Sequence, residues 1–251
     1  MPHFAVYLHP ETCFTSKPIA QIRFIGHSLP HFALVREELA QQLADYPQLP
    51  LRQADFVEFQ RVHNPDYLAA LQRMAADEPV RERPRLSAEC TGFEYCLPGY
   101  RYGLGGMLAA IDCMKSGVLE RVYCFSLGGH HAYADWGHGY CLLNPQAVAV
   151  RYAQERGFAR VLIVDWDIHH GDGTQSIFAH DASVYYLSLH SLADLYMATQ
   201  RVMKDGTTTA AEAVGHCNIP LLSDIYTDEM AVELGLSGKW YRANESLAAF
   251  Q

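Results

Sequence analysis

Short apolar runs alternate with longer amphipathic segments along most of this chain of 251 residues. Buried strands are predicted for the runs rich in β-branched and aromatic residues at 4–9, 121–127, 160–166 and 184–189. Helices are predicted where apolar residues recur at helical spacing, at 31–46, 64–76, 100–116, 145–157 and 174–178. This alternation is typical of an α/β fold with a mainly parallel sheet and right-handed crossovers. No internal repeat or low-complexity linker interrupts it, so we expect a single domain over 1–251.

Two of the predicted helices carry local boundary signals. Asn64 is a candidate N-cap, and Pro65 suits the first turn of the helix that follows it. Gly117 stands where the helix over 100–116 would end, because glycine readily adopts the left-handed conformation found after a helix C-terminus. Both signals support the helical interpretation of their segments.

Composition and charge narrow the class of protein. Hydrophobic residues make up 49% and charged residues 19% of the chain, which allows a substantial core. The net charge of −9 argues against a direct nucleic-acid binder. No uncharged apolar stretch reaches the roughly 20 residues of a membrane span, and the N-terminal residues do not resemble a secretion signal. Seven cysteines without a C-x-x-C spacing suggest reduced thiols, so we expect a cytoplasmic protein with no membrane partner.

Polar side chains gather where three of the predicted strands end. The run at 121–127 is followed by the histidine pair His130 and His131. The run at 160–166 leads into Asp165, Asp167, His169 and Asp172, and the run at 184–189 leads into Ser188, Leu189 and His190. Ligands of parallel α/β sheets bind at the carboxyl ends of strands. If these strands are neighbours, the three clusters form one crevice.

Asp167 and His169 offer an oxygen and a nitrogen ligand two positions apart. On an extended strand end such residues point to the same side, so both can bind one cation. This pair suits Zn²⁺, Fe²⁺ or Mn²⁺. The alternative is a cluster that only caps the strand end through backbone hydrogen bonds. We favour the metal site, because burying so many ionisable groups without a cation is costly.

His130 and His131 are candidates for acid/base chemistry next to such a cation. One or both imidazoles can take a proton from activated water and return it to a leaving amine. Asp165 and Asp172 are then candidate carboxylates that orient an imidazole and raise its basicity. The alternatives are a surface histidine pair in a tight turn and, for Asp172, ordinary turn chemistry before Gly173.

The order and spacing of these motifs resemble the zinc-dependent histone deacetylase superfamily, which includes acetylpolyamine amidohydrolases and acetoin-utilisation proteins. The similarity rests on "GGHHA", "HGYCLLNPQAVAV", "VDWDIHHGDGTQ" and "YYLSLH", and weaker similarity covers nearly the whole chain. The resemblance implies a three-layer α/β/α, arginase/deacetylase-like fold. It also implies hydrolysis of an N-acetylated lysine or amine to the free amine and acetate.

Residue roles carried over from this resemblance extend the candidate site. Asp167 and His169 match two zinc ligands, and His130 and His131 match the catalytic histidines, with Asp165 and Asp172 as partners. A structural potassium site is implied at Asp165, Asp167, His169, Ser188 and Leu189, and a second one at Phe178, Asp181 and Val184. Gly139, Tyr140 and Tyr196 match residues that line the substrate channel.

The sequence departs from the family pattern in its C-terminal part. The segments that carry the third zinc ligand, an aspartate, and the oxyanion-stabilising tyrosine have no counterpart, so the domain is expected to be C-terminally incomplete. Loss of an oxyanion donor typically lowers turnover by roughly 10²–10³. Three functions therefore stay open: a deacetylase, a catalytically inactive interaction module, and a ureohydrolase with two manganese ions. The tandem histidines disfavour the last. The sequence identifies neither the acyl substrate nor the oligomeric state.

Overall fold

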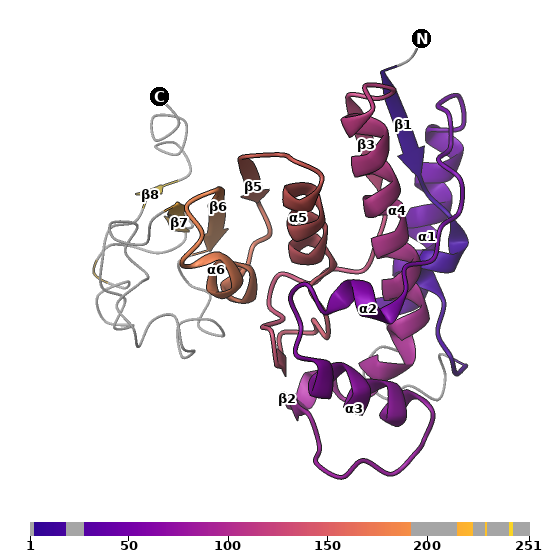
Figure 1. The fold of residues 1–251 in the computed structure, drawn as a ribbon, viewed down its shortest axis with the longest axis vertical. Helices are drawn as coiled ribbons and strands as arrows, with labels where there is room; N and C mark the ends of the chain where they lie inside the picture. Colours follow the sequence, from indigo (N-terminus) through magenta and orange to yellow (C-terminus); the bar gives the residue numbers. More distant parts are fainter. Residues whose placement is uncertain (1–2, 19–27, 192–214, 223–228, 230–240, 243–251) are drawn as a thin grey trace. The chain divides into compact units, whose positions relative to one another are not determined.

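The computed structural model describes residues 3–18, 28–191, 215–222, 229 and 241–242 (Figure 1). The chain divides into two compact units, residues 1–158 and 159–251. In chain order, and with η for a 3-10 helix, the first unit holds β1 (Phe4–Tyr7), η1 (Pro10–Cys13), α1 (Ser28–Gln42), α2 (Phe56–Phe59), α3 (Pro65–Ala75), β2 (Arg85–Leu86), η3 (Ala88–Cys90), η4 (Phe93–Cys96), α4 (Leu97–Lys115), β3 (Arg121–Cys124), β4 (Trp136–Gly137) and α5 (Pro145–Glu155). The second unit holds β5 (Val161–Asp165), α6 (Asp172–Phe178), β6 (Val184–Ser191), β7 (His216–Leu222) and β8 (Tyr241–Arg242).

Strands of the first unit form two parallel pairs. β1 pairs with β3, from Phe4 opposite Arg121 to Tyr7 opposite Cys124. β2 pairs with β4, and Leu86 lies opposite Gly137. Parallel neighbours need a long crossover between them. The predicted alternation of strands and helices is confirmed here, because α4 lies between β1 and β3 in the chain.

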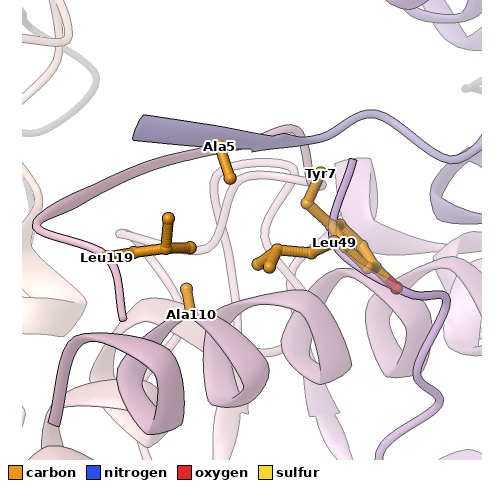
Figure 2. Close-up of a cluster of buried hydrophobic side chains, with 5 residues drawn as sticks. All are labelled: Ala5, Tyr7, Leu49, Ala110 and Leu119. Carbon is orange, nitrogen blue, oxygen red and sulfur yellow. The ribbon is translucent and has the colours of Figure 1, made fainter. Parts of the chain in front are cut away.

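The core between β1 and α4 explains why these segments associate. Figure 2 shows a cluster of buried side chains formed by Ala5, Tyr7, Leu49, Ala110 and Leu119. The Tyr7 hydroxyl, which would be costly to bury alone, lies 3.0 Å from the carbonyl oxygens of Arg52 and Tyr102. Ala110 of α4 thus packs in one apolar cluster with side chains of β1 and of the segments around Leu49 and Leu119.

The predicted helix boundaries are confirmed by their caps. Asn64 Oδ1 accepts hydrogen bonds from the backbone amides of Asp66 and Tyr67, and α3 begins at Pro65. α4 begins at Leu97, three residues earlier than predicted, and ends at Lys115 before Gly117, whose φ is +73°. Among the helices in the described part of the chain, none is both long and apolar enough to cross a membrane.

The second unit contains a parallel four-stranded sheet in the order β5-β6-β7-β8. β5 and β6 pair from Val161 opposite Val184 to Asp165 opposite Ser188, so the condition that these two strands are neighbours is met. α6 connects these two strands and begins at Asp172, two residues before the predicted helix.

The prediction that the strand at 160–166 is buried is wrong for part of β5. Leu162 and Val164 are 60% and 42% exposed. Among the described strands, β5 pairs only with β6 and forms an edge of the sheet. Leu162 and its neighbour on β6, Tyr185, share an exposed face. A short apolar run does not show whether both faces of a strand will be covered, which is why the sequence alone misjudged the burial of β5.

Candidate active site

The histidine pair follows β3 in a tight turn of the first unit. The backbone amide of Ala132 donates to the carbonyl oxygen of Gly129 over 3.0 Å and closes this turn. The ring centroids of His130 and His131 lie 3.9 Å apart. His131 is only 3% exposed. The structure thus brings the two candidate acid/base residues together and buries one of them.

A two-residue hairpin turn packs against His131. The backbone amide of His138 donates to the carbonyl of Cys141, and the reverse bond also forms, both over 2.9 Å. Gly139 and Tyr140 between them have φ values of +59° and +61°, as a type I′ turn requires. A Cβ atom at Gly139 would lie 2.3 Å from His131 Cδ2. Close approach to the histidine therefore requires glycine here, while Tyr140 carries its ring out to solvent.

The candidate metal ligands lie in the loop that follows β5. Asp165 Oδ1 accepts a hydrogen bond from the amide of Asp167 (3.1 Å), and Asp167 Oδ1 accepts one from the amide of His169 (2.9 Å). Asp167 Oδ1 also lies 3.1 Å from His169 Nδ1. The predicted pair is therefore close together, but the expected extended geometry is wrong. β5 ends at Asp165, and two successive side-chain-to-backbone turns bring the pair together.

This donor set fits a small divalent cation. Two tetrahedral ligands held at about 2.1 Å from zinc lie roughly 3.4 Å apart. Asp167 Oδ1 and His169 Nδ1, at 3.1 Å, need only a small adjustment to reach that separation. Both side chains are about half exposed, 51% and 47%, so a cation can reach them from solvent. Among the described residues, no third His, Cys, Asp or Glu joins this pair in a metal-like group.

Asp165 and Asp172, the candidate orienting carboxylates, stand at the two ends of the same loop. Asp165 Oδ2 accepts a hydrogen bond from the Tyr186 hydroxyl over 2.7 Å. Asp172 is the first residue of α6 and is buried. The histidine pair belongs to the first unit and these aspartates to the second, so their pairing stays a prediction. The single crevice formed by the three strand ends also stays a prediction. Among the described strands, β3 pairs with β1 and with no strand of the β5-β6-β7-β8 sheet.

The polar contact of Tyr186 with Asp165 was not found from the sequence. Tyr186 lies opposite Ile163 in the β5–β6 register. Because alternate residues of a strand share a face, Asp165 lies on the same face as Ile163, and the tyrosine reaches it diagonally. Only the register between β5 and β6, which the sequence does not give, would have revealed this hydrogen bond.

A buried polar network behind the metal loop was also missed. His170 Nε2 lies 2.8 Å from Gln175 Oε1 and 3.1 Å from Asn218 Oδ1, so this nitrogen carries the proton and donates. Asn218 Nδ2 donates in turn to Gln175 Oε1 over 2.7 Å. Burial lowers the pKa of His170. Burial is the main cause that lowers the pKa of His190 to about 3, and the nearby His170 lowers it further through electrostatic repulsion. The network thus joins the loop, α6 and β7 through neutral imidazoles.

The residues predicted for potassium and for the channel remain predictions. Ser188 is buried, and its hydroxyl lies 2.9 Å from His190 Nδ1, beside Leu189. At the second predicted potassium site, the backbone amide of Asp181 donates to the carbonyl oxygen of Phe178 (3.0 Å). The backbone amide of Val184 donates to the carbonyl oxygen of Asp181 (3.1 Å). Both loops are ordered by their own hydrogen bonds. Tyr196 lies outside the described residues.

Comparison with known proteins places the chain in a known domain family. The family model of the histone deacetylase domain matches residues 27–234. The chain therefore belongs to the histone deacetylase domain family. Its structure resembles the crystal structure of the HDA15 HD domain with a TM-score of 0.70 and 25% identity, over 86% of this chain and 62% of that one. The predicted arginase/deacetylase-like α/β fold is thereby confirmed.

Among its sequence relatives are an uncharacterised protein, an acetoin utilization protein and a polyamine deacetylase. An uncharacterised protein of Picosynechococcus is 32% identical over 79% of this chain and 63% of its own length. The acetoin utilization protein AcuC of Bacillus subtilis is 32% identical over 71% of this chain and 46% of its own. The polyamine deacetylase HDAC10 of Rattus norvegicus is 33% identical over 57% of this chain and 25% of its own length. The chain thus spans less than two thirds of the length of these relatives.

Proposed function

We propose that this protein is a metal-dependent amidohydrolase that removes acetyl or similar acyl groups from lysine side chains or from amines. One observation carries the proposal: a carboxylate and an imidazole lie 3.1 Å apart directly after β5, in a chain of the histone deacetylase domain family. The histidine pair after β3, of which His131 is buried, supplies a second element of hydrolytic chemistry.

Asp167 and His169 would hold the cation, with zinc as the first choice and iron as the alternative. The chemistry that such an ion supplies is polarisation of the amide carbonyl and activation of water. The Asp167 carboxylate contributes the negative charge that the cation needs. Asp165 keeps that loop in shape, because its Oδ1 accepts the Asp167 amide while its Oδ2 accepts the Tyr186 hydroxyl.

His130 and His131 would move the protons of the reaction. A neutral imidazole accepts a proton at its free ring nitrogen from the attacking water and later returns a proton to the departing amine. Asp165 and Asp172 are proposed to orient these rings. Potassium bound near Ser188 and Leu189, and near Phe178, Asp181 and Val184, would stabilise the two loops.

The net charge of −9 favours a cationic substrate, such as an acetylated polyamine or a lysine-rich peptide. Gly139, Tyr140 and Tyr196 are proposed to line its channel. A relative is named a polyamine deacetylase, and another takes its name from acetoin utilization. The choice between peptide and small amine is therefore part of the test.

A second candidate function is a non-catalytic interaction module of the same family. It is favoured by the exposed apolar residues Leu162 and Val164 on an edge strand. Open strand edges commonly pair with other polypeptides.

Hydrolysis of acetyl-lysine peptides and of acetylated polyamines by the zinc-loaded chain distinguishes the two candidates. The proposal predicts release of acetate that is lost in Asp167→Ala, with circular dichroism showing that both proteins are folded. Iron loading tests the alternative metal. A folded, metal-loaded protein without turnover on any of these substrates would refute the amidohydrolase and leave the interaction module.

A further inference from the structure

A third histidine lies beside the catalytic pair of the first unit. His138 is fully buried, at 0% exposure. Its ring stacks on that of Trp136 with centroids 4.5 Å apart and planes within 16°. The ring centroids of His138 and His131 lie 5.5 Å apart, and a ring nitrogen of each lies within 4.8 Å of the other. The sequence analysis assigned no role to His138, which stands in the stretch between the histidine pair and the channel residues.

A carboxylate lies near His138 on its other side. Its Nδ1 lies 3.8 Å from Oε1 of Glu89, a residue of η3. The same oxygen accepts a hydrogen bond from the backbone amide of Gly139 over 3.2 Å. Burial alone would raise the pKa of Glu89, but hydrogen bonds from Ser87 and from backbone amides, together with His138, lower it on balance. Glu89 is therefore an anion that faces both His138 and the turn.

The turn is anchored independently of these charges. The amide of Ser87 donates to the carbonyl of Gly137 over 2.9 Å, next to the β2–β4 pairing of Leu86 with Gly137. Leu142, just after the turn, accepts from the Tyr67 hydroxyl with its carbonyl. The backbone wall around His131 thus stands without the His138 imidazole. An apolar ring would stack on Trp136 equally well, so packing alone does not explain a buried histidine here.

We propose that His138, with the Glu89 carboxylate beside its Nδ1, is a positioning residue that contributes to the ring orientation and tautomer of His131, in addition to the aspartates proposed above. A carboxylate beside Nδ1 favours the tautomer with the proton on that nitrogen and leaves the lone pair on Nε2. Such a carboxylate–histidine pair presents a fixed dipole to a neighbouring imidazole. The effect on His131 is inferred from these distances and can be tested without activity, while its effect on turnover rests on the proposed amidohydrolase function.

Nitrogen NMR of ring-labelled histidines tests the positioning directly and needs no activity. The His131 signals are assigned by comparison with His131→Asn. In His138→Phe, which keeps an aromatic ring on Trp136, we expect the two ring-nitrogen shifts of His131 to move toward the average of mixed tautomers. Glu89→Gln retains an acceptor for the Gly139 amide, and we expect it to move the same signals in the same direction by a smaller amount.

His63→Gln is the matched control, because it removes another buried histidine of the same unit. It is expected to leave the His131 signals in place. Unchanged His131 signals in both folded His138→Phe and Glu89→Gln would overturn the proposal. If His138→Phe does not fold, Glu89→Gln alone decides it.

Kinetics then separate this inference from the proposed function. In an active, metal-loaded protein, His138→Phe is expected to lower kcat about tenfold while KM stays within about twofold, as for other residues that orient a reacting group. An unchanged kcat would overturn the catalytic part of the inference. If the unmutated protein shows no turnover, the proposed function fails, and the NMR result alone decides whether His138 positions His131.

Discussion

The candidate residues fall into two halves, one in each unit, that are held in place by different forces. In the first unit His131 and His138 are buried, at 3% and 0% exposure, and the hairpin turn at Gly139 packs directly against the His131 ring. In the second unit Asp167 and His169 are half exposed and are held by hydrogen bonds within their own loop. Steric packing fixes the proposed proton-transfer groups, while short-range hydrogen bonds arrange the proposed metal ligands.

This difference fits what each half must do. A proton-transfer group needs one ring orientation throughout the reaction, and close packing gives it at little cost in mobility. Metal ligands must exchange a hydrogen bond for a bond to the cation, so they need room and access to solvent. Changes in the first half should therefore disturb stability and turnover, whereas changes in the second should mainly disturb metal binding.

The largest effect is expected for turnover. In a metal-loaded, active protein His131→Asn should lower kcat by roughly 10²–10⁴, the usual contribution of a general acid/base. Zinc content should stay unchanged, because the ligands lie in the other unit. Measuring kcat and bound zinc on the same sample checks both statements. Loss of zinc together with activity would mean that the two halves do not have the separate roles proposed here.

Steric packing of the first half is tested by Gly139→Ala. The substitution adds a Cβ 2.3 Å from His131 Cδ2 at a φ of +59°, and we expect the free energy of unfolding to fall by about 3 kcal/mol. Gly117→Ala is the matched control: its φ is +73°, but nothing lies within 4 Å of the new atom. In Gly117→Ala the free energy of unfolding should fall by only about 1 kcal/mol, the cost of the left-handed backbone conformation for alanine. Equal losses in urea unfolding would show that the contact with His131 is not tight.

Stability of the first unit should also depend on pH through His63. Burial lowers the pKa of His63 to about 4, and its Nε2 accepts the amide of Asn144 over 2.9 Å. The unfolded chain binds the proton more tightly, so the stabilising contribution is complete above about pH 6.5 and decreases as the pH falls toward 4. The total decrease is about 3 kcal/mol at most. Urea unfolding between pH 7 and 4 should show this slope, and His63→Gln should reduce it. An identical slope in the variant would contradict the assignment.

The smallest effect is expected for the hydrogen bond behind the metal loop. Tyr186→Phe removes the donor to Asp165 Oδ2, which should lower the free energy of unfolding by about 1 kcal/mol and weaken zinc binding roughly tenfold. Tyr185→Phe is the control, because that neighbouring side chain lies on the exposed face of β6. Zinc titration of both variants measures the difference. Equal affinities would show that Asp165 needs no support from Tyr186.

Local signals made much of the fold predictable from the sequence. Asn64 and Gly117 marked helix ends because caps depend on a few adjacent residues. The parallel direction of β5 and β6 followed from the alternation of strands and helices. The exposure of Leu162 did not follow, since it depends on which strands and helices cover β5.

The candidate site was predictable only where its residues are close in the chain. Asp167 and His169 meet because they are two positions apart. Asn218 contacts His170 across 48 positions, and Glu89 approaches His138 across a similar distance in the chain. Such contacts depend on strand register and on the placement of turns, and residue spacing alone does not encode either.

The central claim is that the loop after β5 is a metal site, and the zinc content and affinity of the purified chain test it most directly. The account predicts near-stoichiometric zinc that is lost in Asp167→Ala, while circular dichroism shows the same fold for both proteins. Zinc binding that is equally tight in Asp167→Ala would contradict the claim. A folded chain that holds no zinc or iron at all would contradict it as well.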